Sequence, residues 1–150
     1  MKPRLAHIAL RAGDVEKTAA FYREVLGFPE AFRMHGPGDP GSPPVLTGIY
    51  LYIAESQFIE IFPGGLDRRP EGPGLTGPVH FCIEVDDAAA ALEEIRLRGA
   101  PVDKELATGY SRCRQFWTHD PDGNAIEFME LTPESLQQGA NERLAASPAG

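Results

Sequence analysis

Two histidines and two glutamates occupy matching places in the two halves of this sequence: His7 with Glu60, and His80 with Glu127. Each glutamate lies in the middle of an apolar run and shares its strand face with apolar neighbours two positions away. A buried lone carboxylate costs several kcal/mol unless it is paired or binds a metal. Because two imidazoles and two carboxylates form an N2O2 ligand set, the sequence predicts one divalent-metal site, with Zn, Ni, Co, Mn or Fe as candidates.

Taken singly, these residues have simpler explanations. A histidine at the start of a strand is commonly a hydrogen-bonded structural residue, and a glutamate in an apolar strand can be satisfied by arginine or backbone amides. An internal repeat favours the metal site. Each histidine precedes a helix-capping aspartate by 7 residues, and each helix ends at a glycine, 20 or 19 residues after the histidine. These landmarks are His7, Asp14 and Gly27 in the first half, and His80, Asp87 and Gly99 in the second.

The hydrophobic periodicity predicts an α+β fold built from two βαβββ modules. We expect module one at residues 4–63, a Gly- and Pro-rich linker at 64–78, module two at 79–131, and a C-terminal helix and tail at 132–150, all in one domain. The first module should contain strands at 5–10, 28–34, 45–53 and 57–62 and a helix at 15–26. The second should contain strands at 79–85, near 102, at 113–118 and at 125–131, a helix that Asp86 or Asp87 caps and that ends at 98, and a final helix capped by Thr132.

The charge balance limits the possible partners. With 14 basic against 22 acidic side chains the net charge is -8, which disfavours binding to nucleic acid. The start of the chain lacks the apolar core of a signal peptide, and no apolar run approaches the ~20 residues of a membrane span. We therefore expect a cytoplasmic protein that does not bind membranes. Cys82 and Cys113 are too few for a disulfide framework and should be reduced thiols.

Several motifs resemble the vicinal oxygen chelate superfamily, which includes glyoxalase I, extradiol dioxygenases, methylmalonyl-CoA epimerase, fosfomycin-resistance thiol transferases and bleomycin-binding proteins. The resemblance covers residues 5 to about 131. It rests on the segments 7–14, 21–28, 58–62, 77–80 and 120–127, which read HIALRAGD, FYREVLGF, FIEIF, GPVH and DPDGNAIE. The resemblance implies that the two modules pair into a cupped, mixed β-sheet, commonly across a homodimer interface.

By this resemblance, His7, Glu60, His80 and Glu127 match the metal ligands of glyoxalase I, which isomerises the hemithioacetal of glutathione and methylglyoxal. The implied chemistry is metal-assisted proton transfer beside a carbonyl of a small α-oxo substrate, with Glu127 or Glu60 as the catalytic proton carrier. Dioxygenases of the superfamily use two His and one Glu, so Glu60 favours the isomerase pattern. The complete ligand set weighs against a drug- or metabolite-binding resistance protein.

Three further residues are candidates for binding the substrate. Arg11 lies four residues after His7 on the same strand face and matches an arginine that glyoxalase I uses for the glutathione carboxylate. Arg114 and Trp117 lie on a strand expected to line the cup, where an anionic substrate could meet Arg114 and its neighbours Arg112 and Gln115, although these three could equally be solvated. The segment after Glu60 lacks the asparagine found in glutathione-specific relatives. The substrate therefore stays open, and an epimerase, dioxygenase or thiol transferase is the alternative.

Overall fold

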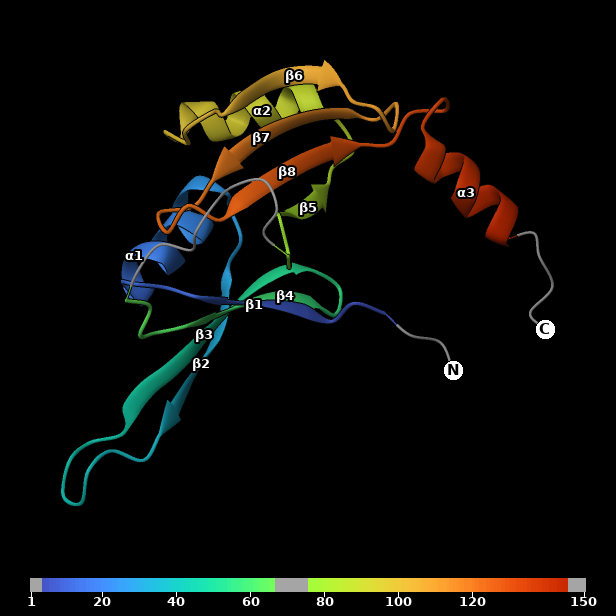
Figure 1. The fold of residues 1–150 in the computed structure, drawn as a ribbon. Helices are drawn as coiled ribbons and strands as arrows, with labels where there is room; N and C mark the ends of the chain where they lie inside the picture. The colour runs from blue at the N-terminus through green and yellow to red at the C-terminus, as the bar shows by residue number, and fades with distance from the viewer. Residues whose placement is uncertain (1–3, 67–75, 146–150) are drawn as a thin grey trace. The chain divides into compact units, whose positions relative to one another are not determined.

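The computed structural model describes residues 4–66 and 76–145 (Figure 1). Most of the predicted linker, residues 67–75, and the end of the predicted tail, residues 146–150, lie outside the described ranges. The elements are β1 (His7–Arg11), α1 (Val15–Ala20), a π-helical turn (Phe21–Val25), β2 (Glu30–Gly36), β3 (Val45–Ala54), β4 (Gln57–Phe62), β5 (Phe81–Glu84), α2 (Ala88–Leu97), β6 (Lys104–Thr108), β7 (Arg114–His119), β8 (Ala125–Glu130) and α3 (Leu136–Ala145).

The two halves of the chain have the same topology. The first sheet has the order β1-β4-β3-β2 and the second β5-β8-β7-β6. In each sheet the first strand pairs with the last in parallel, and the other neighbours are antiparallel. The prediction of an α+β fold with two βαβββ modules is confirmed. The chain divides into two compact units, residues 1–74 with 120–123, and residues 75–119 with 124–150.

In the first unit, one face of the sheet packs on α1. The alternation of strand side chains directs Ile49 and Leu51 of β3, with Ile59 and Ile61 of β4, into a fully buried core. Asp14 begins α1 by accepting hydrogen bonds from the amides of Glu16 and Lys17. The opposite face of the same sheet carries His7, Glu60 and a group of aromatic side chains.

The second unit repeats this plan with different core residues. Asp87 caps α2 through the amides of Ala89 and Ala90, and α2 lies along one face of its sheet (Figure 1). The rings of Phe116 and Phe128 stack with their centroids 4.9 Å apart in the core beneath it. Both helices are followed by a glycine with positive φ, Gly27 at 78° and Gly99 at 87°, as the repeat predicts.

Several element boundaries differ from the prediction. The helix from Val15 changes to π-helical geometry at Phe21, where the Leu26 amide donates to the Phe21 carbonyl at 3.2 Å. The strand expected from Phe28 begins two residues later, since Pro29 has no amide to donate to a ladder. His80 precedes β5 rather than opening it. The predicted short strand near Val102 is β6, which begins two residues further on.

The predicted start of the final helix is wrong. Thr132 was expected to cap it, but its hydroxyl donates to the Arg112 carbonyl at 3.1 Å, and a turn over residues 132–135 comes first. Ser135 takes the capping role instead, because its Oγ accepts a hydrogen bond from the Gln138 amide at 3.3 Å. None of the helices within residues 4–66 and 76–145 combines the length and the apolar character needed to cross a membrane.

Candidate metal and substrate site

Each unit brings one of the predicted histidines to one of the predicted glutamates. In the first unit His7 Nε2 lies 3.5 Å from Glu60 Oε2, and in the second His80 Nε2 lies 3.0 Å from Glu127 Oε2. Both glutamates are buried, with 6% of Glu60 and 9% of Glu127 exposed, whereas the histidines remain partly accessible to solvent. A buried carboxylate that meets an accessible imidazole can share either a proton or a metal with it.

The strand register makes the two pairs equivalent. Glu60 lies opposite the residue two positions after His7, and Glu127 lies opposite the residue two positions after His80. On the other side, Glu60 faces Tyr50 and Glu127 faces Trp117. Each histidine ring packs edge-on against this aromatic residue, with centroids 6.0 Å apart in the first unit and 4.6 Å in the second. The repeat seen in the sequence is therefore also a repeat of the site.

The surroundings of the two glutamates differ in polarity. Burial and a hydrogen bond to Glu60 raise the pKa of Tyr50, so its hydroxyl stays protonated. Tyr50 also stacks on Phe32 with centroids 4.4 Å apart. Beside Glu127, burial and then the carboxylate charge raise the pKa of Cys82 to about 12, which keeps the thiol protonated. The first glutamate thus lies among aromatic rings, and the second among polar groups.

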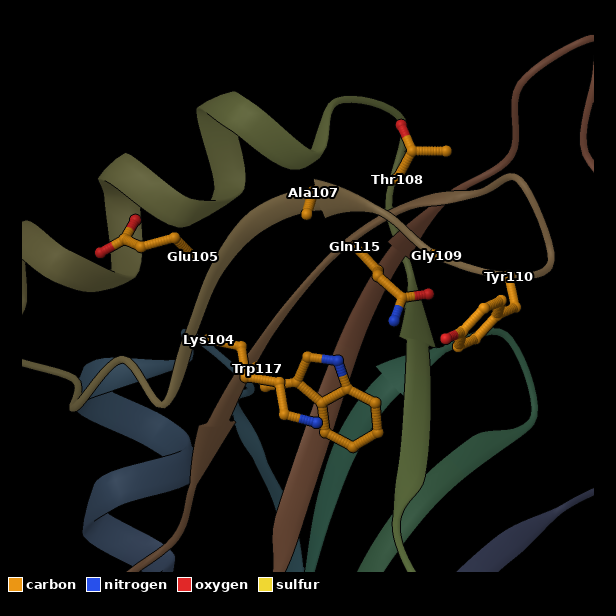
Figure 2. Close-up of a pocket in the computed structure, with 8 residues that line it drawn as sticks. All are labelled: Lys104, Glu105, Ala107, Thr108, Gly109, Tyr110, Gln115 and Trp117. Atoms are coloured by element: carbon orange, nitrogen blue, oxygen red, sulfur yellow. The ribbon is translucent and has the colours of Figure 1, made fainter.

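An open pocket of about 560 Å³ in the second unit is lined in part by Gln115 and Trp117, the two residues that contact or face Glu127. It is bordered by β6, the following turn and β7, and Figure 2 shows the side chains that line it. The Lys104 Nζ lies 4.3 Å from the centroid of the Trp117 ring, a cation–π contact. Gln115 and Trp117, both expected on a strand that lines the cup, do line this pocket, whereas Lys104 was not a candidate. The alternation along β7 that places Trp117 beside Glu127 also applies to Gln115.

The two arginine candidates have different positions. Arg11 lies on the face of β1 that carries His7, donates to the Pro63 carbonyl at 3.0 Å, and places its guanidinium 5.9 Å from the Phe62 ring centroid. Arg114 pairs with Glu130 at 2.8 Å. It alternates with Gln115 along β7, so it lies on the opposite face from Trp117. Trp117 and Arg11 thus share strand faces with predicted ligands, and Arg114 does not.

The site residues fit a metal in type and burial, but each pair supplies only two ligands. A catalytic zinc centre uses three protein ligands and keeps one position open. Within the described ranges, no three His, Cys, Asp or Glu side chains gather as a metal-binding group. Each pair alone is therefore smaller than such a ligand set. The fold and these pairs define a class of protein, one with twinned βαβββ modules and a His–Glu pair in each.

Comparison with known proteins gives this class its family. A family model described as the Glyoxalase/Bleomycin resistance protein/Dioxygenase superfamily matches residues 4–128, and the chain belongs to that superfamily. A lactoylglutathione lyase of Escherichia coli O157:H7 is 33% identical over 130 residues, which cover 85% of this chain and 92% of that protein.

Two further relatives extend the comparison. A probable chloroplastic lactoylglutathione lyase of Arabidopsis thaliana is 32% identical over 154 residues, covering 91% of this chain, which spans only 39% of that protein's length. The crystal structure of a glyoxalase family protein from Enterococcus faecalis superposes with a TM-score of 0.69 at 25% identity, covering 85% of this chain and 97% of that one. The predicted resemblance and fold are confirmed.

Proposed function

We propose that this protein is a divalent-metal-dependent lyase or isomerase of the glyoxalase I type. Its substrate would be a small α-oxo compound or a hemithioacetal, changed by proton transfer between adjacent carbons. The observation that supports this most directly is the equivalence of the His7–Glu60 and His80–Glu127 pairs in register and burial. Relatives of about one-third identity that are named lactoylglutathione lyase support the same activity.

The four paired residues would hold one metal ion, Zn, Ni, Co, Mn or Fe. When bound, such an ion polarises the substrate oxygens and favours loss of a proton from the neighbouring carbon. The chain itself supplies the proton carrier. Glu127 is the better placed of the two glutamates, because it contacts Gln115 and faces Trp117, and both of these line the pocket. Glu60 lies among aromatic rings and would serve chiefly as a ligand.

The remaining candidates would bind the substrate. Trp117 offers an indole face beside His80, and Arg11 offers a cation on the face of β1 that carries His7. Since each unit holds half of the ligands, the site needs both units, from one chain or from two. We propose a homodimer that acts on a small molecule in the cytoplasm. One relative, by contrast, is named as a chloroplastic protein.

Two measurements on the purified protein test the proposal. Metal analysis after reloading should find one divalent ion per pair of units, and the loaded protein should form lactoylglutathione from methylglyoxal and glutathione. Absence of stoichiometric metal would point to a binding protein of the superfamily. A loaded protein without this activity would point to the alternative, an epimerase, extradiol dioxygenase or thiol transferase, because one fold hosts several chemistries.

A further inference from the structure

The second unit contains an amide contact to Glu127 that has no counterpart at Glu60. The amide of Gln115 satisfies two neighbours in one orientation: its Nε2 donates to Glu127 Oε1 at 2.9 Å, and its Oε1 accepts from Trp117 Nε1 at 3.3 Å. The other carboxylate oxygen, Glu127 Oε2, faces His80. Both oxygens of Glu127 therefore have a partner, and the oxygen on the His80 side stays available for a metal.

Gly109, which has no side chain, leaves room for the Gln115 amide in this arrangement. A Cβ at Gly109 would lie 2.3 Å from the Gln115 amide atom that contacts Glu127 and 2.7 Å from the amide carbon, so any larger residue there would push the amide away. The φ of Gly109 is not in the positive range that favours glycine, so an alanine would not strain the backbone. Space for the amide, rather than backbone conformation, accounts for glycine at this position.

The corresponding position in the first unit carries no such group. Gln115 lies two residues before Trp117, which faces Glu127, and Gly48 lies two residues before Tyr50, which faces Glu60. A Cβ at Gly48 would lie 2.8 Å from the Met34 methyl group, so apolar atoms fill that space. The two His–Glu pairs match, but only the second has a neutral amide donor fixed on its carboxylate.

We propose that Gln115 is a positioning residue that holds Glu127 in the orientation needed to bind the metal and to move the substrate proton. This inference rests on the proposed function. Partners that orient a metal ligand commonly affect metal affinity by about 10–100-fold when they are removed. Trp117, the only tryptophan in the sequence, donates to the same amide, so its fluorescence should report the state of Glu127.

The experiment compares Zn²⁺ affinity, measured with a competing indicator, and Trp117 emission, with and without Zn²⁺. Gln115→Met removes the amide, and Gly109→Ala displaces it without removing it. Gln138→Met is the matched control, because Gln138 also donates to a glutamate, Glu142, at 2.8 Å, but on the exposed face of α3. Circular dichroism checks the fold of each variant.

Both Gln115→Met and Gly109→Ala should weaken Zn²⁺ binding by about 10–100-fold and abolish the Zn²⁺-dependent change in emission, while Gln138→Met behaves as the wild type. Zn²⁺ affinity and emission response unchanged in Gln115→Met would overturn the inference. If the wild type binds no Zn²⁺, the proposed metal site fails by itself. The emission of Trp117 without metal then tests the contact between Gln115 and Glu127. Both Glu127→Gln and Gln115→Met should shift this emission, and an unshifted spectrum in both variants would reject the contact.

Discussion

Glu60 and Glu127 hold equivalent positions but differ in their neighbours, and this difference separates their expected roles. Glu60 lies opposite Tyr50 and near Phe58, whereas Glu127 contacts the amide of Gln115, which lines the pocket. The sequence predicted both carboxylates because each interrupts an apolar strand. It did not fix which neighbours contact each glutamate, because those contacts depend on the register of the adjacent strands.

The first prediction separates the two glutamates under saturating metal. Glu127→Gln should lower kcat by about 10²–10⁴-fold, the usual contribution of a general base, while metal still binds. Glu60→Gln should mainly raise the metal concentration needed for half activity, and should retain a larger share of kcat. Steady-state kinetics with metal titration measure both effects. Equal loss of kcat in the two variants would contradict the distinct roles.

At the scale of elements, β2 is linked to α1 by one arginine. Arg33 donates to Glu16 of α1 at 2.5 and 3.0 Å and to Glu30 of its own strand at 2.7 and 2.9 Å. The hydrogen bond from Arg33 lowers the pKa of Glu30 below its ordinary value of 4.5. A carboxyl group with a lowered pKa adds stability above its ordinary pKa, and loses that contribution as the pH falls through the lowered value.

The second prediction follows from this linkage. Arg33→Met should reduce the free energy of unfolding by about 0.2–1 kcal/mol near neutral pH, because the pairs are partly exposed. The difference from the wild type should shrink as the pH falls below 4.5. Urea denaturation across this range measures it. The control is Arg98→Met, which breaks only the pair with Glu94 at the end of α2. If the stability difference between Arg33→Met and the wild type grew in acid, the assignment of the Arg33–Glu30 pair would be refuted.

Some boundaries of helices and strands were predictable from the sequence and others were not. Helix starts at Asp14 and Asp87 and the glycine stops were predictable, since capping is a local interaction of a few residues. The start of α3 was not, because the hydroxyl of Thr132 is used by the Arg112 carbonyl, a partner distant in the sequence. The same limit applies to Arg114, whose strand face could not be assigned until the register of β7 was known.

At the scale of the whole molecule, the two units divide the proposed ligands equally. In the proposed homodimer, each site would combine the first unit of one chain with the second unit of its partner. Such a twofold arrangement makes the two sites of the dimer equal. The sequence predicted the ligands from the repeat, but pairing between units is a property of the assembly that strand periodicity does not specify.

The third prediction tests this division by mixing two variants at a metal concentration too low to activate Glu60→Gln alone. Glu60→Gln alters the first unit and Glu127→Gln the second, so a mixed dimer would keep one fully intact site. Co-refolded variants should regain about a quarter of the wild-type activity, since half of the dimers are mixed and half of their sites are intact. Light scattering should show twice the 16.3 kDa chain mass. No regain in a confirmed mixed dimer would place the whole site within one chain.

One feature of the first unit concerns the origin of the repeat. The turn at residues 120–123, between β7 and β8, is part of the first compact unit. There, Asp120 accepts a buried hydrogen bond from Tyr22 at 2.9 Å, and Asp122 accepts from Thr18 at 2.6 Å and from the Gly13 amide at 2.9 Å. If the two halves arose by gene duplication, they are no longer interchangeable copies. If the gene were divided between the two halves, the first helix and the turn after it would lose hydrogen-bond acceptors that are encoded about 100 codons downstream.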